Sequence, residues 1–462
     1  MTKWPIQKED LVRPAYRSLA RKIVQAIESG DLPSGAKLPT HRALSYDLEL
    51  SVQTVSRAYD ELNRLGFIVG EVGRGSFVRR RSGDAQVPWN RSSVEADVID
   101  CSMLVPVTGD IHEQCMAQTL GELAKDIPRS SLFSFRPRAT FEGHVKEAAR
   151  WISAGGVPVE PDRIIPTNGN TAAMSLALQT VALPGELVVT ETIGHHTLKS
   201  LTSTLGLRLQ GLAIDAEGIV PDAFEAVCRT DAVKALFIMP SGLGPTCSFA
   251  GADRRRALND IARKYNVWII ESDAWGPINP ERSPSFAELA PDRTFYFTGV
   301  TKCLLPGLRI GWLVVPESMI SAARNRHLVT NWMATPLMAE IASRWIIDGT
   351  AQSLLKWQRK NLDRRNAIAK SKFGSLDFVS SPFGMHIWLP LPEPWKAQDF
   401  VELARHEGVA VAASSNFRTG EEAAPEAVRV CVGIGTEQEL AKGLGIVARL
   451  AGSSPEPALL AI

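Results

Sequence analysis

Cysteine is scarce and scattered in this chain of 462 residues. The six cysteines, at positions 101, 115, 228, 247, 303 and 431, form no C-x-x-C pair and no cysteine–histidine cluster at zinc spacing, so the pattern favours a reducing cytoplasm and predicts no structural metal. There is no apolar run of about 18 residues, and the N-terminal MTKWPIQKED has no apolar core of a signal peptide. We therefore expect a cytoplasmic, globular protein without a membrane span.

The chain also has little net charge, +1 overall, but the charge is unevenly distributed. Residues 1–82 carry 14 Lys and Arg against 9 Asp and Glu, whereas the remainder carries 37 against 41. A basic end is where a nucleic-acid partner would bind. Because so small an excess is equally compatible with a solvated surface, the sequence pattern within this segment has to decide.

The first eighty residues predict three helices followed by a hairpin. One helical pattern runs from about residue 15 to 29, a second follows Leu38-Pro39-Thr40 through residue 47, and a third begins at the N-cap Ser51 and runs to about residue 65. The next run, FIVGEVGRGSFV, has two β-rich segments flanking Gly73-Arg74-Gly75, as a hairpin requires. This order indicates a winged helix-turn-helix, and a plain helical bundle is the alternative.

The stretch from GDLPSGAKLPT to GRGSFV resembles the DNA-binding domain of the GntR family nearly end to end. The resemblance implies that the third helix lies in the major groove of double-stranded operator DNA, with arginines near phosphates or the minor groove. Binding should then be sensitive to salt. The residues expected to contact DNA are Arg42, Ser51, Gln53, Thr54, Ser56, Arg57 and Arg74.

From residue 79 the chain becomes polar and loses periodicity, in RRRSGDAQVPWNRSSVEAD. We interpret residues 1–80 as the DNA-binding domain, 81–98 as a linker and 99–462 as a second, larger domain. In that domain helical stretches alternate with the strand-like runs DRIIPT, ELVVTE, ALFIMP, VWIIESD, TFYFTG and RIGWLVV. Such alternation predicts an α/β fold with a large, mainly parallel sheet between helices. HIWLPLP and AVRVCVGI are less regular and predict a small α+β lobe at the C-terminus.

The run TGVTKCLLPGLRIGWLVVP is the most informative part of this domain, because a lysine follows a predicted strand and precedes an arginine by seven residues. The Lys302 amine can hold an aldehyde cofactor as a Schiff base, and Arg309 can grip a phosphate with a bidentate fork. This combination points to pyridoxal 5'-phosphate. The run resembles the S-x-[ST]-K-x-x-x-P-G-x-R-x-G segment of fold-type I aminotransferases, and the resemblance extends over both lobes.

Other loops match the cofactor site of that family. In TNGNTAAMSLAL, a strand gives way to a helix whose free N–H groups can cradle a phosphate. ETIGHHTLK has His195 where the family stacks an aromatic ring on the pyridine, although a histidine pair is also compatible with ordinary polarity. The residues assigned to the cofactor are Gly169, Asn170, Thr171, His195, Asp273, Trp275, Thr301, Lys302 and Arg309.

Three positions depart from the family pattern. Gly299 replaces a serine, Gly244 replaces an asparagine that hydrogen-bonds the cofactor's phenolic oxygen, and Trp275 replaces a tyrosine. Asp273 is the candidate partner of the pyridinium nitrogen, which makes the ring an electron sink. The register is open, because the family has two acidic or amide positions where this chain has Ser272 and Asp273.

Near the C-terminus, Arg429 in AVRVCVGIGTEQELAKGL occupies the place of the arginine that binds a substrate's α-carboxylate. A surface arginine on an edge strand is the alternative. A GntR-like reader joined to an aminotransferase-like domain resembles the MocR subfamily of bacterial regulators. That resemblance implies a homodimer and a small amine or amino-acid effector, and the text around ETIGHHTLK is similar to regulators of ectoine utilisation, whose effectors resemble diaminobutyrate derivatives.

We therefore expect a transcriptional regulator, a repressor by analogy with GntR-like readers, and not an enzyme. The effector's amine would displace Lys302, and its carboxylate would meet Arg429. The changes at Gly244 and Trp275 argue against an efficient aminotransferase. Two alternatives stay open: a working aminotransferase with an accessory DNA-binding domain, and a regulator that binds its effector without the cofactor.

Overall fold

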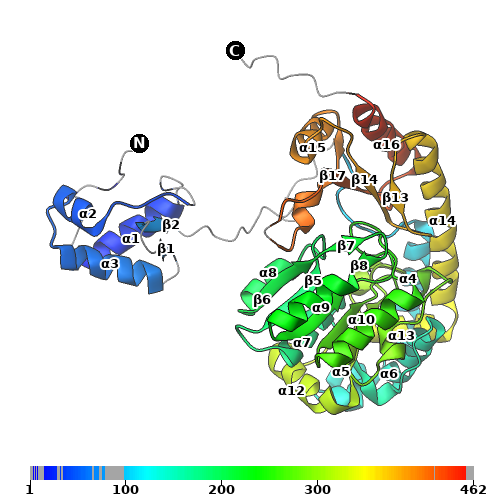
Figure 1. The fold of residues 1–462 in the computed structure, drawn as a ribbon. Coiled ribbons are helices and arrows are strands. Elements are labelled where there is room, and N and C mark those ends of the chain that lie inside the picture. The colour runs from blue at the N-terminus through cyan, green and yellow to red at the C-terminus, as the bar shows by residue number, and fades with distance from the viewer. Residues whose placement is uncertain are drawn as a thin grey trace. The chain divides into compact units, whose positions relative to one another are not determined.

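The computed structural model describes residues 4, 6, 8, 15–28, 32, 35–64, 67–71, 75–78, 98–420 and 422–453. The chain divides into two compact units, 1–92 and 93–462, and we describe each by itself (Figure 1). The predicted linker, 81–98, lies almost wholly outside the described residues; regular structure resumes at β3, Ile99–Asp100.

The first unit contains the three predicted helices and the hairpin. The helices are α1 (Ala15–Glu28), α2 (His41–Asp47) and α3 (Val52–Arg64), and the antiparallel strands are β1 (Ile68–Glu71) and β2 (Gly75–Val78). Thr40 caps α2 by accepting a hydrogen bond from the Ala43 N–H at 3.2 Å, and Ser51 accepts from the Thr54 N–H at 3.0 Å, as the N-cap prediction required. Leu19, Ile23 and Val55 pack in the core of this unit.

A seven-stranded sheet forms the centre of the second unit, in the order β4-β12-β11-β10-β9-β5-β6. The strands are β4 (Ile164–Thr167), β5 (Leu187–Glu191), β6 (Arg208–Leu212), β9 (Val233–Ile238), β10 (Trp268–Ser272), β11 (Thr294–Gly299) and β12 (Gly311–Val314). Only β12 among them runs antiparallel to its neighbours, β11 and β4. The six predicted strands are all present; β6 was missed, because most of its side chains alternate between exposed and half-buried on an edge strand.

Helices cover both faces of this sheet (Figure 1). Alternate residues of β9 enter two different cores: Ala235 and Phe237 pack with α7, whereas Leu236 and Ile238 pack with α10. The helices of the large lobe are α4 (Asp110–Asp126), α5 (Arg129–Phe133), α6 (Pro137–Ala154), α7 (Asn170–Val181), α8 (Leu198–Thr204), α9 (Pro221–Thr230), α10 (Ala252–Lys264), α11 (Phe286–Leu289), α12 (Ile320–Asn331) and α13 (Pro336–Ile347). Between β6 and α9 the chain makes a small hairpin of β7 (Ile214–Asp215) and β8 (Gly218–Ile219).

The small lobe is built on a second sheet, in the order β13-β14-β17-β16. Its elements are β13 (Val379–Ser380), β14 (His386–Pro390), β16 (Ala412–Ala413), β17 (Ala427–Cys431), α15 (Ala397–His406) and α16 (Glu437–Ala451). The long helix α14 (Thr350–Phe373) runs from the large lobe to the small lobe, where it packs against α16 (Figure 1). β3 pairs in parallel with β15 (Val409–Ala410), so the first described strand of this unit joins the small lobe. The predicted α/β fold with an α+β C-terminal lobe is confirmed.

Candidate functional site

Lys302 and Arg309 lie in the connection between two hydrogen-bonded strands. β11 ends at Gly299 and β12 begins at Gly311, and Gly299 is paired with Gly311 in the antiparallel ladder. Within the connection, Arg309 takes a left-handed conformation with φ 48° at the end of a short 3-10 helix. This connection therefore links two adjacent strands of the sheet. Lys302 and Arg309, seven residues apart, both lie in it.

The N-terminus of α7 and the Arg309 guanidinium form one side of the site. Gly169, at φ 79°, is the N-cap of α7, and a Cβ built on it would lie 3.2 Å from an Arg309 guanidinium nitrogen. Only a residue without a side chain lets the guanidinium and the helix N-terminus approach this closely. Among the described residues, the buried Asn170 Oδ1 and Thr301 Oγ1 have no hydrogen-bond partner. The Thr301 hydroxyl, the Arg309 guanidinium and the free N–H groups of the helix N-terminus can each donate to an anionic group, whereas Asn170 Oδ1 is an acceptor and cannot. Thr171 follows in the same turn of α7 and is exposed.

The Lys302 side chain is half-buried, and its Nζ donates to the Leu104 carbonyl. The pKa of Lys302 is lowered to about 8, mainly by burial and also by the charges of Arg429 and Arg309, against an opposing effect of Cys431. A lysine with this pKa has an appreciable neutral fraction near pH 7 to 8. It is therefore a competent nucleophile toward an aldehyde.

His195 follows β5, at the same edge of the sheet as the connection that carries Lys302. Its ring is stacked on His196 with centroids 4.6 Å apart and meets Phe237 edge-on at 6.2 Å. The pKa of His195 is lowered to about 4, mainly by burial and also by the charges of Lys302 and Arg429. The coupling to both cations places the imidazole among the other predicted site residues. A neutral flat ring in this position is able to stack on a heteroaromatic cofactor.

Arg429 lies on β17 of the small lobe and is 5% exposed. One guanidinium nitrogen donates to the Ser102 carbonyl at 2.7 Å, and the guanidinium lies 4.5 Å from the centroid of the Phe417 ring. Within the part of the chain that the structure describes, its Nε is buried without a partner. This arginine is thus a buried group and not the surface residue of the alternative interpretation, and it keeps a donor for an anion such as a carboxylate.

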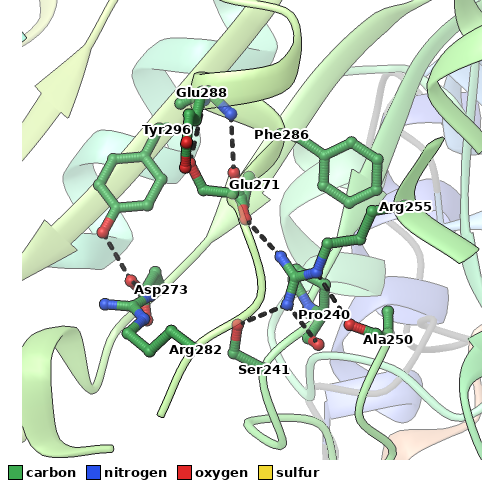
Figure 2. A network of polar contacts seen from close by, with 12 residues as sticks. Pro240, Ser241, Ala250, Arg255, Glu271, Asp273, Arg282, Phe286, Glu288 and Tyr296 are labelled. Carbon is green, nitrogen blue, oxygen red and sulfur yellow. Dashed lines mark hydrogen bonds and ion pairs between the residues drawn. The ribbon is translucent and has the colours of Figure 1, made fainter. Parts of the chain in front are cut away.

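Asp273 and Trp275 follow β10, and Figure 2 shows the contacts of Asp273. The Asp273 carboxylate accepts a hydrogen bond from the Tyr296 hydroxyl at 2.5 Å and forms an ion pair with Arg282. The Trp275 indole meets the His386 ring at 5.8 Å, and its buried Nε1 has no partner among the described residues. Sequence reasoning missed Arg282 and His386, because neither lies at a position that the family resemblance assigns to the cofactor.

Gly299 and Gly244, which replace a serine and an asparagine of the family pattern, have different surroundings. A Cβ at Gly299 would lie 2.6 Å from Asn170 Oδ1 and 2.7 Å from the Ile310 carbonyl oxygen, so the local packing excludes a side chain there. At Gly244 the nearest atom to such a Cβ is the Met239 methyl carbon at 3.7 Å, which is ordinary contact. The Gly244 carbonyl is hydrogen-bonded to His386 Nε2 at 2.9 Å.

In the first unit, the predicted DNA-contacting residues of α3 lie away from its core. Ser51, Gln53 and Arg57 are exposed, Thr54 and Ser56 are half-buried, and the exposed Arg42 projects from α2. The Arg57 guanidinium lies 4.1 Å from the centroid of the Tyr16 ring. This cation–π contact holds the side chain at the surface of the unit. Arg74 lies outside the described residues.

The described residues offer neither a metal-binding cluster nor a membrane-spanning helix. They contain no group of three or more His, Cys, Asp or Glu side chains placed to hold a metal ion. Within the same residues, the helices are too short or too polar to cross a bilayer.

Comparison with protein families identifies both parts of the chain. Residues 124–447 match the family "Aminotransferase class I and II", and residues 15–78 match "Bacterial regulatory proteins, gntR family". The uncharacterized HTH-type transcriptional regulator YdeF of Bacillus subtilis is 28% identical over 453 residues, which cover 97% of this chain and 96% of YdeF. The HTH-type pyridoxine biosynthesis transcriptional regulator PdxR of Corynebacterium glutamicum is 25% identical and covers 78% of each chain.

Solved structures share the fold of the second unit. Kynurenine aminotransferase of Pyrococcus horikoshii has a TM-score of 0.71 at 20% identity, covering 77% of this chain and 91% of that one. The α-aminoadipate aminotransferase LysN of Thermus thermophilus has a TM-score of 0.70 at 18% identity, with coverage of 77% and 92%. These likenesses establish a fold-type I aminotransferase architecture.

This fold implies pyridoxal phosphate as the cofactor, and the residues present fit it. Arg309, Thr301 and the start of α7 suit its phosphate, and the low pKa of Lys302 suits its aldehyde. The chain therefore belongs to the aminotransferase class I and II family and carries a gntR-type helix-turn-helix domain ahead of it, as HTH-type transcriptional regulators of similar sequence do.

Proposed function

We propose that this protein is a DNA-binding transcriptional repressor whose aminotransferase-like domain holds pyridoxal phosphate on Lys302 and senses an amine-bearing amino acid. The observation that carries the proposal is the pairing of a low-pKa lysine with a buried arginine, in a chain that also has a gntR-type reader. Bound pyridoxal phosphate would supply an aldehyde that Lys302 holds as a Schiff base and that an incoming amine can take over.

The effector's chemistry follows from the two cations. Lys302 marks the place of its amine, and Arg429 offers a buried guanidinium to its carboxylate. Arg429 links two distant parts of the chain, since it lies on β17 and donates to the Ser102 carbonyl in the segment after β3. A carboxylate that binds this guanidinium competes with that carbonyl. Ligand binding is therefore coupled to the segment that leads directly to the linker. The effector that we propose is an ectoine-derived diaminobutyrate.

An exposed apolar surface supports the proposal of a homodimer. Large side chains on α5, on α12 and in the loops that follow them are exposed: Leu132 by 50%, Phe133 by 67%, Phe135 by 77%, Val329 by 88% and Trp332 by 51%. Trp332 Nε1 donates to the Phe135 carbonyl at 3.2 Å, so the two segments are joined. Apolar surface of this kind marks an interaction site, and a second copy of the chain is the partner that we propose.

The experiment that tests the proposed function has two stages. Borohydride reduction of protein loaded with pyridoxal phosphate, followed by mass spectrometry of its peptides, should locate an adduct on Lys302. DNA selected from random duplexes is then used in a mobility-shift titration with 2,4-diaminobutyrate and its acylated derivatives. We expect the effector to shift DNA affinity in the wild type and in the exposed-lysine control Lys199→Ala, and not in Lys302→Ala. A normal response of Lys302→Ala would contradict the proposal.

The aminotransferase fold keeps enzymatic activity as the second candidate function. Keto acid formation from the effector, measured with the same loaded protein, distinguishes the two. A turnover of about 1 s⁻¹ or faster, in the range of ordinary enzymes, would favour the enzyme.

A further inference from the structure

Ser272 stands on the face of the sheet that carries His195. In the ladder of β10, Ser272 is paired with Phe297 of β11, and Ile270, two residues earlier, is paired with Phe237 of β9. The rings of Phe237 and Phe297 are 6.3 Å apart, and His195 meets Phe237 at 6.2 Å. Because residues two apart in a strand share a face, Ser272 lies on the side where the predicted stacking histidine is found.

Asp273 is engaged by other side chains, and Figure 2 shows it with Tyr296 and Arg282. Glu271 is paired with Tyr296 in the ladder and contacts Arg255 of α10 at 3.2 Å, so this register faces the other core. The Tyr296 hydroxyl then donates to Asp273 at 2.5 Å. Two residues apart on the same strand line, Glu271 and Asp273 thus belong to one polar network on the face away from His195.

The charge of Asp273 is already compensated by Arg282. Asp273 is 2% exposed, and the Arg282 side chain that pairs with it is 15% exposed. Arg282 is fixed in turn by donating to the carbonyls of Gly155 and Gly276, each at 3.0 Å. Turning the carboxylate toward a ligand would leave a buried guanidinium without its counter-charge, which is strongly unfavourable.

The residues on the phosphate side and Lys302 indicate where a pyridine nitrogen would point. Arg309 and Gly169 lie on the phosphate side, and Lys302 marks the aldehyde. In pyridoxal phosphate the ring nitrogen is para to the carbon that bears the aldehyde, so it points away from Lys302. β10 is the next strand beyond β11 in the sheet, and the last residue of β10 is Ser272.

We propose that Ser272, and not Asp273, is the side chain that meets the pyridine nitrogen of bound pyridoxal phosphate. This inference rests on the proposed function, because it requires the cofactor. A serine hydroxyl donates a hydrogen bond to a neutral ring nitrogen but supplies no negative charge to keep that nitrogen protonated. The ring is then a weak electron sink. Ser272 thereby allows an amine to be bound while its α-carbon keeps its proton, which suits a sensor.

Nitrogen NMR of the full-length protein loaded with pyridoxal phosphate labelled with ¹⁵N in the ring tests this assignment. We expect the wild type to give the signal of an unprotonated pyridine nitrogen at pH 7, and Ser272→Asp to give that of a protonated one. Ser272→Asp should also raise the rate of keto acid formation by at least tenfold. Asp273→Asn should keep the unprotonated signal, although it destabilises the fold.

A protonated wild-type signal would overturn the inference, as would a shift in Asp273→Asn with none in Ser272→Asp. If Asp273→Asn does not fold, Tyr296→Phe, which removes one hydrogen bond to Asp273 and keeps Arg282, takes its place with the same expectation. Failure of the proposed function is distinguishable, because it leaves no borohydride adduct on Lys302. An adduct with a protonated nitrogen contradicts only the assignment of Ser272.

Discussion

The two sides of the cofactor site differ in how completely their polar groups are satisfied by the protein. On the phosphate side, the Thr301 hydroxyl is buried without a partner among the described residues, and the Arg309 guanidinium lies close to Gly169, the N-cap of α7. On the side of β10, Asp273 is hydrogen-bonded to Tyr296 and paired with Arg282. Buried polar groups are costly unless they are bonded. The first side is therefore arranged for a ligand. On the second side, the protein itself satisfies the polar groups.

This difference separates binding from activation. Holding pyridoxal phosphate requires phosphate donors and a lysine, whereas driving its chemistry requires a carboxylate on the ring nitrogen. The chain keeps the first set and uses the Asp273 carboxylate as part of a structural network. Binding without efficient turnover is the property that a sensor of amines needs.

The sharpest way to test the side of β10 is to remove Arg282. Arg282→Ala leaves the Asp273 carboxylate, 2% exposed, without its counter-charge. We expect the free energy of unfolding to fall by about 3–5 kcal/mol, measured by urea denaturation. Arg208→Ala breaks an ion pair whose side chains are 57% and 33% exposed and should cost less than about 1 kcal/mol. Equal effects of the two substitutions would show that the Asp273 network contributes nothing special.

On the phosphate side, Arg309→Ala should weaken binding of pyridoxal phosphate with little loss of stability. Loss of charge-assisted hydrogen bonds to the phosphate predicts a rise in Kd of roughly 30- to 100-fold, or about 2–3 kcal/mol. Fluorescence titration measures it. Arg309→Lys should fall in between, because it keeps the charge and loses the fork. Arg256→Ala, which removes an exposed arginine of α10, is the control; unchanged affinity in Arg309→Ala would refute the assigned role.

Restoring the family's serine at position 299 sharpens the comparison further. A Cβ there would lie 2.7 Å from the Ile310 carbonyl and 2.6 Å from Asn170 Oδ1, so Gly299→Ser should destabilise the domain by about 1–3 kcal/mol and bind the cofactor no better. Thermal unfolding and the same titration measure both effects. The matched control is Gly307→Ala in the same connection, where no atom lies within 4 Å of the new Cβ. Tighter cofactor binding in Gly299→Ser would count against this view of the packing.

The smallest expected effect is a pH dependence. The pKa of Lys302 is lowered, mainly by burial, to about 8 from an ordinary value of 10.5, and only the neutral amine attacks an aldehyde. The rate of adduct formation should rise about tenfold per pH unit up to about pH 8 and then level off, as followed by stopped-flow absorbance. Arg429→Met removes a charge that lowers this pKa, so its plateau should begin at higher pH. A rate that keeps rising to pH 10 would show an ordinary lysine.

Much of the candidate site was visible in the sequence, because local motifs build it. The lysine and arginine of the β11–β12 connection, and the glycine that opens α7, each need only their own loop to take shape. The strand runs were equally visible, since both faces of a mainly parallel sheet are buried and its strands are continuously apolar. The edge strand β6 was missed for the opposite reason.

The sequence by itself determined the two families and the cofactor and predicted the lysine that would hold it, because each rests on residues close together in the chain. The tertiary structure decided what distant residues do to one another. Arg282 and Tyr296 reach Asp273 from outside its motif, and Arg429 reaches the segment after β3 from the far end of the chain. Sequence spacing cannot report on such pairs. Their side chains meet because strand faces alternate and distant segments pack together, and proximity along the chain plays no part.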